Sequence, residues 1–526
     1  MGTGHVFVIQ GLLEHLDCDA VIVPSDERFV IESDWDAVVG RSDGADAAGL
    51  RPAGWATKRF GRAGACDACA PPLPTWFIDA TWFEGQDATT AAQDLAGRLA
   101  ATLREIARAG IVPRHDRPHP LVAVPALGTG GGGFNEIRGL LLDLLLETCQ
   151  DVVGMTAVDV AIVAKHPADY SAFQEVRRRR PSPERDLAPE LQEAAGRIAG
   201  AARRGELALF LGAGVGVAAG LPSWSELLAR LERRAAVPLD DLAPLDRAEL
   251  LRRELGEGFG QAVVEELSGA DRYALTHATL AALGCMEVVT TNYDTLYEVA
   301  AGDVVRAPVP VLPGAVVQAG VPWVLKMHGD LARPESIVLF RSDFVRYDAM
   351  ARPVASVVQS LMVTRHLLVV GTSMTDDNFL RLAHEVAAFQ ARHGRRYGGP
   401  AGRAGQPDEG TSLIGTVVTL TPKPAQERLW RGRFRYVATA DGAGTSQEAA
   451  RRLAIFLDLV AMLAAHRDHY LLDQRYERML ASAPERRAAD LARRLARELP
   501  ALADGAPAGW RRLLHQLQAL GASADG

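Results

Sequence analysis

Short apolar runs rich in Val, Ile and Leu alternate with longer segments of helical periodicity along most of the chain, which leaves few folds open. Helices are expected over residues 91–109 and 136–148 and between the later strands. The expected strands are residues 6–9, 21–23, 76–78, 121–124 and 158–163 in the first half, and 207–211, 288–291, 323–327, 367–370 and 416–420 in the second. Such an order places helices against a largely parallel sheet. We therefore predict the α/β class, with two Rossmann-like, doubly wound domains.

At 526 residues the chain exceeds what one hydrophobic core normally organises, so it should divide into domains. The clearest boundary is residues 177–186, where four adjacent arginines and two prolines indicate an exposed linker. The end of the chain is rich in Ala, Leu, Arg and Glu and should be helical. The predicted organisation is a first domain over residues 1–176, a linker over 177–190, a second domain over 191–475 and a helical tail over 476–526.

Composition limits the classes of partner. The formal net charge of −8 gives no support for nucleic acid as a direct partner, which would favour a basic balance. The first residues carry no basic segment followed by an apolar run, and no stretch reaches the roughly 18 uninterrupted apolar residues of a membrane helix. We therefore expect a soluble cytoplasmic protein without a signal peptide or a membrane partner.

The cysteines favour the same compartment. Five cysteines are too few for a disulfide framework in a chain of this size. Cys66 and Cys69 form one C-x-x-C pair, and no second pair completes a zinc quartet. We expect reduced cysteines and no bound metal.

A glycine turn follows the first strand of the second half. The strand over residues 207–211 runs directly into Gly212-Ala213-Gly214. Glycine allows a tight turn and a close approach of the backbone to a diphosphate, because no Cβ intervenes. Farther on, Gly220 precedes Ser223 and Glu226, whose spacing predicts a capping box at the start of a helix. A lone G-x-G is weak evidence of a nucleotide site, since many strand-to-helix turns need glycine.

Three further polar segments each follow an expected strand. They are T-T-N-Y-D at residues 290–294, K-M-H-G-D at 326–330, and G-T-S at 371–373 with Asp376, Asp377 and Asn378 after it. Each has a structural explanation, because Asn and Asp commonly end strands and a single His is more often structural than catalytic. Open α/β sheets bind ligands beyond the carboxyl ends of their strands, so four such segments in this order predict one shared crevice.

In combination, these motifs resemble the sirtuin superfamily over about residues 207–458, and within it the bacterial branch of antiphage NADases typified by the Thoeris effector. The resemblance implies that the glycine turn cradles the NAD diphosphate and that G-T-S lies near the adenosine half. It also implies that the Asn and Asp of T-x-N-x-D line the nicotinamide end and that the His of K-M-H-G-D contacts the nicotinamide ribose. Carried over by position, the NAD-binding candidates are Gly212, Ala213, Gly214, Gly220, Thr291, Gly371, Thr372 and Ser373, and the catalytic candidates are Asn292, Asp294 and His328.

The implied reaction cleaves NAD, as substrate, to nicotinamide and ADP-ribose. Asn292 can hold the carboxamide or a water molecule without adding charge, and His328 can accept a proton near neutral pH. Sirtuin deacylases carry a four-cysteine zinc module after the catalytic His, and this chain has no cysteine after Cys285, so water is the expected acceptor. One departure stands out, because Gly216 occupies a position where the family usually has Ser. Deacylation, ADP-ribosyl transfer and non-catalytic binding of NAD or ADP-ribose remain alternatives.

The first domain contains a second glycine loop. Gly128, Gly130 and Gly133 follow the strand over residues 121–124 and precede a helix. The segment over about residues 6–166 resembles a macro domain or a related nucleotide-sensing fold, although residues 24–27 read P-S-D-E where the family has N-A-A-N. The resemblance implies binding of an ADP-ribose-like signalling nucleotide that gates the NADase. The alternative is a degenerate domain used for oligomer contacts, and a homo-oligomer is expected in either case.

Overall fold

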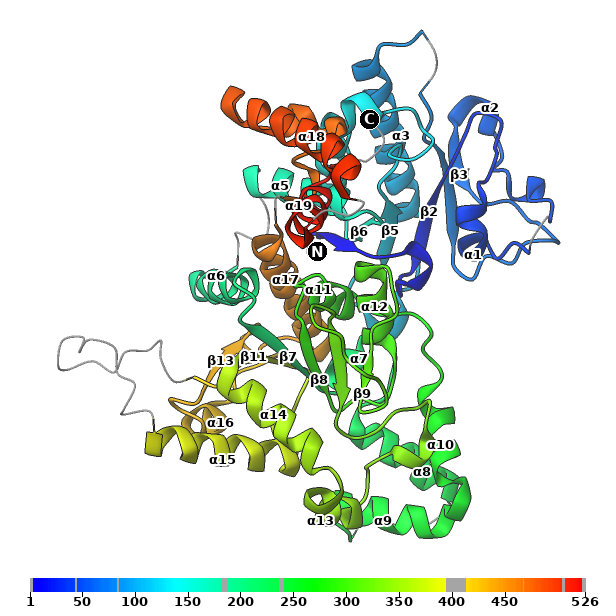
Figure 1. Ribbon diagram of the computed structural model, residues 1–526. Helices are drawn as coiled ribbons and strands as arrows, with labels where there is room; N and C mark the ends of the chain where they lie inside the picture. Colours follow the sequence, from blue (N-terminus) through cyan, green and yellow to red (C-terminus); the bar gives the residue numbers. More distant parts are fainter. Residues whose placement is uncertain are drawn as a thin grey trace. The chain divides into compact units, whose positions relative to one another are not determined.

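The computed structural model of the protein describes residues 3–42, 45–82, 85–180, 187–235, 241–393, 413–466, 468–503 and 507–522. The chain forms two compact units (Figure 1). Unit 1 consists of Met1–Leu187 together with Ala465–Gly526, and unit 2 consists of Ala188–Ala464. Each unit is built around its own sheet flanked by helices, so the predicted α/β class with two such domains is confirmed.

Unit 2 contains a seven-stranded sheet in which every pair of neighbours is parallel. The strands are β7 (Leu207–Leu211), β8 (Glu287–Thr290), β9 (Val311–Leu312), β10 (Trp323–Lys326), β11 (His366–Val370), β12 (Gly415–Thr419) and β13 (Phe434–Ala438). Their order across the sheet is β13-β12-β11-β7-β8-β10-β9. Strands β8, β9 and β10 lie on one side of β7, and strands β11, β12 and β13 lie on the other side. The carboxyl end of β7 is therefore a topological switch point, where such sheets bind ligands.

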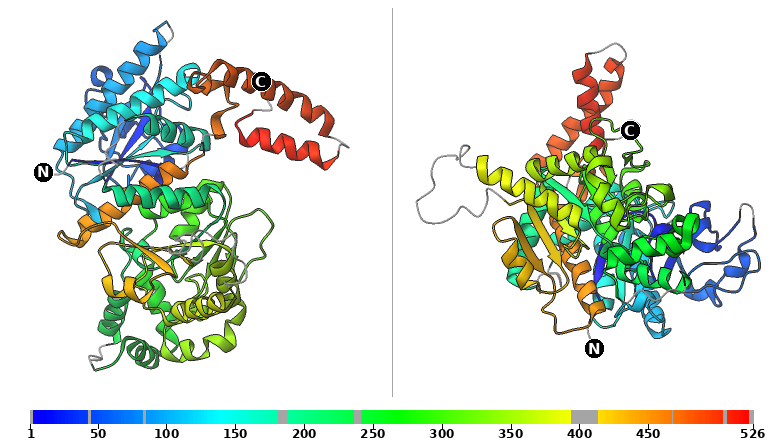
Figure 2. Two further views of the ribbon diagram at one scale, coloured as in Figure 1. Left: turned by 90° about the vertical axis from the view of Figure 1, so that its left-hand side faces the viewer. Right: turned by 90° about the horizontal axis from the view of Figure 1, so that it is seen from below.

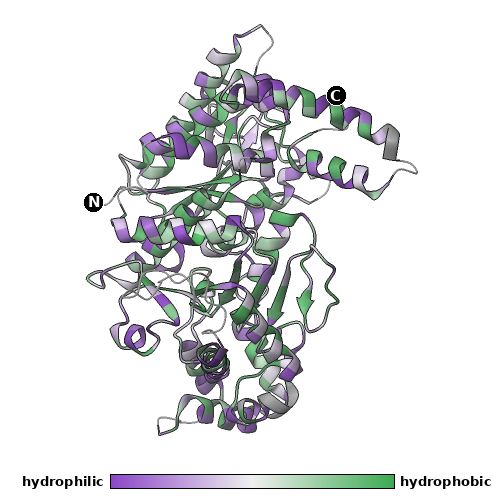
Figure 3. Ribbon diagram, turned by 60° about the vertical axis from the view of Figure 1, so that its left-hand side comes forward, coloured by the Kyte–Doolittle hydropathy of each residue, from purple (hydrophilic) through white to green (hydrophobic). Residues whose placement is uncertain are grey.

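Helices cover the sheet of unit 2, which explains why its strands read as continuous apolar runs. The helices are α6 (Pro189–Arg203), α7 (Gly214–Val217), α8 (Trp224–Ala235), α9 (Pro244–Leu255), α10 (Phe259–Leu267), α11 (Leu275–Ala281), α12 (Leu296–Val305), α13 (Arg341–Met350), α14 (Arg352–Thr364), α15 (Asp377–His393), α16 (Pro424–Leu429) and α17 (Ser446–Ala464). Helices α14 and α15 share one buried cluster with the strands, centred on Phe210, Val369 and Phe379. Figure 3 shows the strands as predominantly hydrophobic.

Unit 1 contains a six-stranded sheet of order β1-β6-β5-β2-β4-β3, parallel except for β3. Its strands are β1 (Val6–Gln10), β2 (Ala20–Ser25), β3 (Phe60–Arg62), β4 (Thr75–Asp79), β5 (Leu121–Pro125) and β6 (Asp159–Ala164). Its helices before the C-terminal segment are α1 (Asp36–Val39), α2 (Trp55–Lys58), α3 (Ala88–Arg108), α4 (Arg138–Val153) and α5 (Pro167–Arg179). Strand β2 lies between β5 and β4, so the strand order of this sheet also reverses next to a central strand.

The C-terminal segment is helical, as expected, and belongs to unit 1. Helices α18 (Ala483–Ala503) and α19 (Ala508–Ala519) run side by side as a hairpin (Figure 2). Before them, the buried Tyr476 donates a hydrogen bond of 2.5 Å to Asp169 of α5. Arg138 of α4 binds the same carboxylate with two of its nitrogens and donates to the carbonyl of Thr129 in the glycine loop. A buried polar network thus connects this segment to that loop.

The expectation that the basic run forms an exposed linker is wrong for residues 177–180. Residues 177–179 end helix α5, and the Arg177 side chain is fully buried. Glu175 pairs with Arg178 at 3.0 Å and with Arg179 at 2.8 Å, while Arg180 pairs with acidic residues of α4. These carboxylates offset the repulsion between the adjacent cations, so the helix can continue. Residues 181–186 lie outside the described part of the chain.

Among the described residues, no helix combines the length and apolar character needed to span a bilayer.

Candidate functional site

The glycine turn after β7 packs directly against the turn after β11. Gly214 N–H donates to the Gly371 carbonyl at 2.8 Å, and a Cβ on Gly212 would lie 2.6 Å from that oxygen. Gly371 has φ +74°, and its own Cβ would lie 2.6 Å from the Val215 nitrogen. Both turns therefore require glycine for close packing. This contact joins two of the predicted motifs at the switch point.

The turn leaves one backbone amide available. Gly212 N–H donates to the Val370 carbonyl at 2.9 Å, and Gly214 N–H is also committed. Ala213 N–H makes no hydrogen bond within the described residues. Ala213 is thus the donor of this turn that an anionic ligand could use.

Asn292 lies just beyond β8 and is tied to the glycine turn. Its Nδ2 donates to the Gly212 carbonyl at 3.2 Å, and Thr291 N–H donates to the Leu211 carbonyl at 3.1 Å. The Asn292 Oδ1 atom is buried and has no hydrogen-bond partner in the described part of the chain. A buried acceptor without a partner carries a desolvation penalty of about 1–3 kcal/mol, which a bound donor would offset.

His328 lies just beyond β10, the neighbour of β8. Thr290 and Lys326 are paired across these strands, so Asn292 and His328 each follow the paired position by two residues. The His328 side chain is 6% exposed, and its Nε2 lies 3.4 Å from Asp376 Oδ2 in the segment after β11. Burial lowers the pKa of His328, and the Asp376 carboxylate opposes that shift. Burial therefore favours the neutral imidazole, and an acidic residue lies beside it.

Lys326 connects the segments that carry Asn292 and His328, although the sequence assigned it no role. Its side chain is fully buried, and Nζ donates to the carbonyls of Tyr293 at 2.9 Å and Asp294 at 2.7 Å. The same nitrogen pairs with Glu298 at 2.9 Å and with Asp330 at 3.5 Å. Burial raises the pKa of Glu298, and Lys326 opposes the rise. One cation thus positions the loops that carry Asn292 and His328.

Asp294 faces the position where the family usually has Ser. Its Oδ1 accepts from Leu296 N–H at 3.0 Å, and its Oδ2 lies 3.7 Å from where a Cβ on Gly216 would be. The fully buried His277 also interacts electrostatically with Asp294, and burial lowers the pKa of His277 to about 4. No feature of the sequence distinguished His277, because its relation to Asp294 exists only in the fold.

The remaining candidates of unit 2 make local contacts. Thr372 Oγ1 accepts from Met374 N–H at 3.1 Å, and the exposed Ser373 shares a hydroxyl contact of 2.6 Å with Thr375. Gly220 has φ +86° and lies in the turn before α8. The predicted capping box at α8 is confirmed, since Ser223 N–H donates to Glu226 Oε2 at 2.7 Å and Glu226 N–H donates back to Ser223 Oγ at 3.4 Å.

The glycine loop of unit 1 borders a separate cavity of about 230 Å³. Gly128 and Gly130 line it, together with the ends of β2 and β5, whereas Gly133 does not. Gly128 has φ +73°, and its Cβ would lie 2.8 Å from Phe134. A Cβ on Gly130 would meet nothing within 4 Å. Asp169, the residue bound by Arg138 and Tyr476, also lines this cavity.

The comparisons with known proteins find similarity to one family model and to several curated proteins. Residues 286–400 match the model of the SIR2-like domain family. The chain is 29% identical over 199 residues to "NAD(+) hydrolase ThsA" of Bacillus cereus, covering 36% of this chain and 42% of the relative. It is 27% identical to the protein of the same name from Enterococcus faecium over equal shares, and 22% identical to "Defense-associated sirtuin 2" of Bacillus subtilis over 37% of this chain and 20% of that one.

Two solved structures are also similar at low identity. One is a Sir2 enzyme, with 14% identity, coverage of 52% of this chain and 98% of that chain, and a TM-score of 0.29. The other is an Oceanobacillus iheyensis macrodomain mutant, with 12% identity, coverage of 33% and 90%, and a TM-score of 0.25. The chain spans about two fifths of the length of the NAD hydrolases that it matches. The residues that match the SIR2-like domain family include Asn292 and His328, in agreement with the resemblance that the sequence motifs indicated.

Proposed function

We propose that unit 2 hydrolyses the bond between nicotinamide and ribose in NAD and that the protein acts in antiphage defence. The observation that carries this proposal is the meeting of the predicted motifs around the switch point. There Asn292 is bonded to the turn after β7, and His328 lies beside a carboxylate that follows β11. The NAD hydrolases among the relatives support the same activity, and defence is the role that the bacterial branch implies.

The residues present fit NAD. The free amide of Ala213 can meet the diphosphate, and Thr372 and Ser373 lie on the turn proposed for the adenosine half. The unpartnered Oδ1 of Asn292 can accept from the carboxamide of nicotinamide or from a water molecule. Following the sirtuin resemblance, we place His328 against the nicotinamide ribose and Asp294 at the nicotinamide end of NAD.

The proposed reaction is a displacement at the anomeric carbon of the ribose. The N-glycosidic bond breaks, and its electron pair goes to the ring nitrogen, so nicotinamide leaves neutral. Water forms the new carbon–oxygen bond and gives up one proton, which His328 accepts. The products are nicotinamide, ADP-ribose and a proton. Asp376 stabilises the imidazolium that forms, because its carboxylate lies 3.4 Å from Nε2.

Incubation of the full chain with NAD alone tests this function. Release of nicotinamide with an equal amount of ADP-ribose, and no acceptor added, is the expected result. Release that requires an acylated peptide, or transfer of ADP-ribose to protein, would instead assign deacylation or ADP-ribosyl transfer. NAD binding without any cleavage would favour the non-catalytic alternative. The observation behind that alternative is Gly216, which lies beside Asp294 where the family usually has Ser.

The acid side of the pH profile is a second expected result. Burial lowers the pKa of His328 from its ordinary value of 6.5, and only the neutral imidazole can accept a proton. The rate should therefore stay constant as the pH falls through 6.5 and decline, by about tenfold per pH unit, only below the lowered pKa. Asp376→Asn removes the carboxylate that opposes the shift and should move this decline to still lower pH. An acid limb above pH 6.5 would contradict the assignment of His328 as the base, provided the protein remains folded.

For unit 1 we propose that the glycine-loop cavity binds an ADP-ribose-like nucleotide that gates cleavage in a cytoplasmic homo-oligomer.

Cyclic ADP-ribose and ADP-ribose, each added at millimolar concentration to the NAD assay, probe this control. Gly130→Leu places a side chain where the protein leaves open space and should abolish the nucleotide's effect without changing the basal rate. An identical response of the variant and the unaltered protein would exclude this cavity, and sedimentation with and without nucleotide reports the oligomer.

A further inference from the structure

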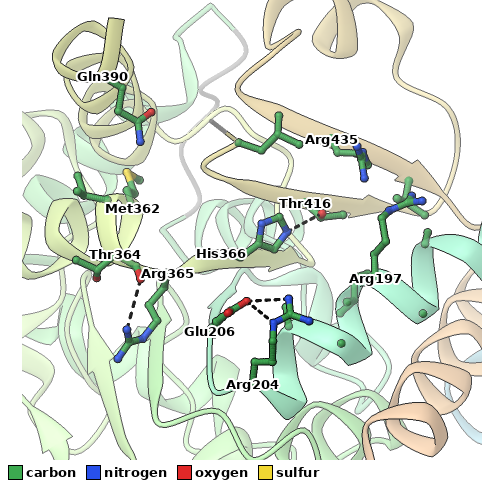
Figure 4. Close-up of a pocket in the computed structure, with 18 residues that line it drawn as sticks. Arg197, Arg204, Glu206, Met362, Thr364, Arg365, His366, Gln390, Thr416 and Arg435 are labelled. Atoms are coloured by element: carbon green, nitrogen blue, oxygen red, sulfur yellow. Dashed lines mark hydrogen bonds and ion pairs between the residues drawn. The ribbon is translucent and has the colours of Figure 1, made fainter. Parts of the chain in front are cut away.

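Unit 2 has a cavity at the edge of its sheet opposite the proposed NAD site. The NAD site lies at the carboxyl ends of the parallel strands, whereas this cavity of about 670 Å³ lies at their amino ends. Glu206 precedes β7, His366 begins β11, and Arg435 is near the start of β13 (Figure 4). Residues of α6 and of the end of α14 complete the lining. The two sites are therefore separated by the length of the strands.

Four arginines and one glutamate line the cavity, so the charged side chains of its lining are predominantly cationic. Three of these arginines have acidic partners: Arg204 pairs with Glu206 at 2.8 Å, Arg365 with Glu287 at 2.9 Å, and Arg197 with Glu193 at 2.5 Å. In Figure 4, Arg197 and Arg435 extend from different elements on the same side of the view.

Arg435 differs from the other arginines of the cavity. Its backbone is part of the β13 ladder, but its side chain forms no hydrogen bond or ion pair with the described residues. A guanidinium carries five N–H donors and binds phosphate or carboxylate oxygens in pairs. Arg435 is therefore an anion-binding group whose side chain has no partner among the described residues.

A histidine and a threonine form a neutral polar pair next to this arginine. His366 Nε2 lies 2.9 Å from Thr416 Oγ1. Burial lowers the pKa of His366, the positive charge of Arg435 lowers it further, and Glu206 opposes both. A ligand anion beside Arg435 would offset the repulsion that disfavours imidazolium, and the hydroxyl and ring could bind its polar atoms.

Part of the lining is apolar. Ile198, Met362, Val363, Leu413 and Val437 contribute hydrocarbon surface to the same cavity. A volume of 670 Å³ lies within the range of about 300–1,000 Å³ typical of small-molecule sites. The cavity thus offers cationic donors to one part of a ligand and an apolar surface to another.

We propose that this cavity is a second ligand site, which takes a small organic phosphate of mononucleotide size. The phosphate binds Arg435, with Arg197 nearby, and the ring or chain of the ligand lies against the apolar residues. The proposal does not depend on NAD cleavage, because it rests only on this edge of the sheet.

Hydrogen exchange of the full chain with and without ADP tests the proposal, because the location of the protection separates this site from any other that binds ADP. We expect millimolar ADP to slow exchange in the last turns of α6 and at the starts of β11 and β13. Arg435→Glu should raise the ADP concentration needed for that protection by about tenfold or more, because it replaces a donor by a carboxylate that repels the phosphate. Arg428→Glu, on the exposed face of α16, has the same charge change and should leave the protection intact.

Two results would overturn this site. One is unchanged exchange in these segments up to the highest ADP concentration, with correctly folded protein. The other is protection that Arg435→Glu and Arg428→Glu affect equally. Thermal unfolding of both variants shows whether the folded state is retained, and Arg435→Gln, which removes the charge and leaves an uncharged polar side chain, provides a milder second variant.

Discussion

Substitution of His328 by Ala should lower kcat for NAD cleavage by about 100- to 10,000-fold, the usual contribution of a positioned general base. The imidazole is 6% exposed and lies 3.4 Å from the Asp376 carboxylate, so it is a positioned base that is largely shielded from bulk solvent. Binding of NAD should change much less, because the proposed diphosphate contact is the Ala213 amide on another loop. Steady-state rates of nicotinamide release measure kcat and KM separately.

A matched control distinguishes catalysis from folding. His384→Ala makes the same substitution on the exposed side of α15 and should retain full activity. Added imidazole should restore part of the rate of the His328 variant, because the small base can occupy the vacated space, and a purely structural role would not give this rescue. A His328→Ala protein that is folded and cleaves NAD within a factor of about ten of the unaltered chain would remove His328 from the mechanism.

Much of this site could be predicted from the sequence because its motifs lie at the ends of strands. Strand β7 is five consecutive buried residues, and β8, β10, β11 and β12 were all expected to within one residue or so of their observed bounds. In a parallel sheet the carboxyl ends of such strands share one edge, so the order of the motifs was enough to bring Asn292 near the glycine turn. The turns themselves require glycine, which is visible in the sequence.

Other elements were missed for physical reasons. Strand β13 reads F-R-Y-V-A, in which charged and aromatic residues interrupt the apolar run, and β9 has only two residues. The helix through Arg177–Arg179 is stabilised by Glu175, and Arg180 after it pairs with acidic residues of α4, which local charge patterning does not reveal. Whether such segments form a strand or a helix depends on contacts with residues far away in the sequence.

Lys326 is the clearest example of a role that only the fold reveals. In the sequence it is one charged residue after an apolar run. In the structure its ammonium group is fully buried and holds carbonyls of the T-N-Y-D segment while it neutralises Glu298 of α12 and Asp330. A buried charge of this kind is tolerated only when its partners are in place.

Lys326→Met should therefore destabilise unit 2 by about 3–5 kcal/mol, the usual effect of removing one partner of a buried ion pair. Methionine fills a similar volume, so the loss reflects the carboxylate of Glu298 and the two carbonyls left without their donor. Faster hydrogen exchange of the β8 and β10 amides measures this effect within unit 2 alone. The double variant Lys326→Met/Glu298→Gln removes the isolated charge and should recover part of the protection. If the double variant exchanged as fast as the single one, the carboxylate of Glu298 would not be the cause, and Lys326 would act through the loop carbonyls and Asp330.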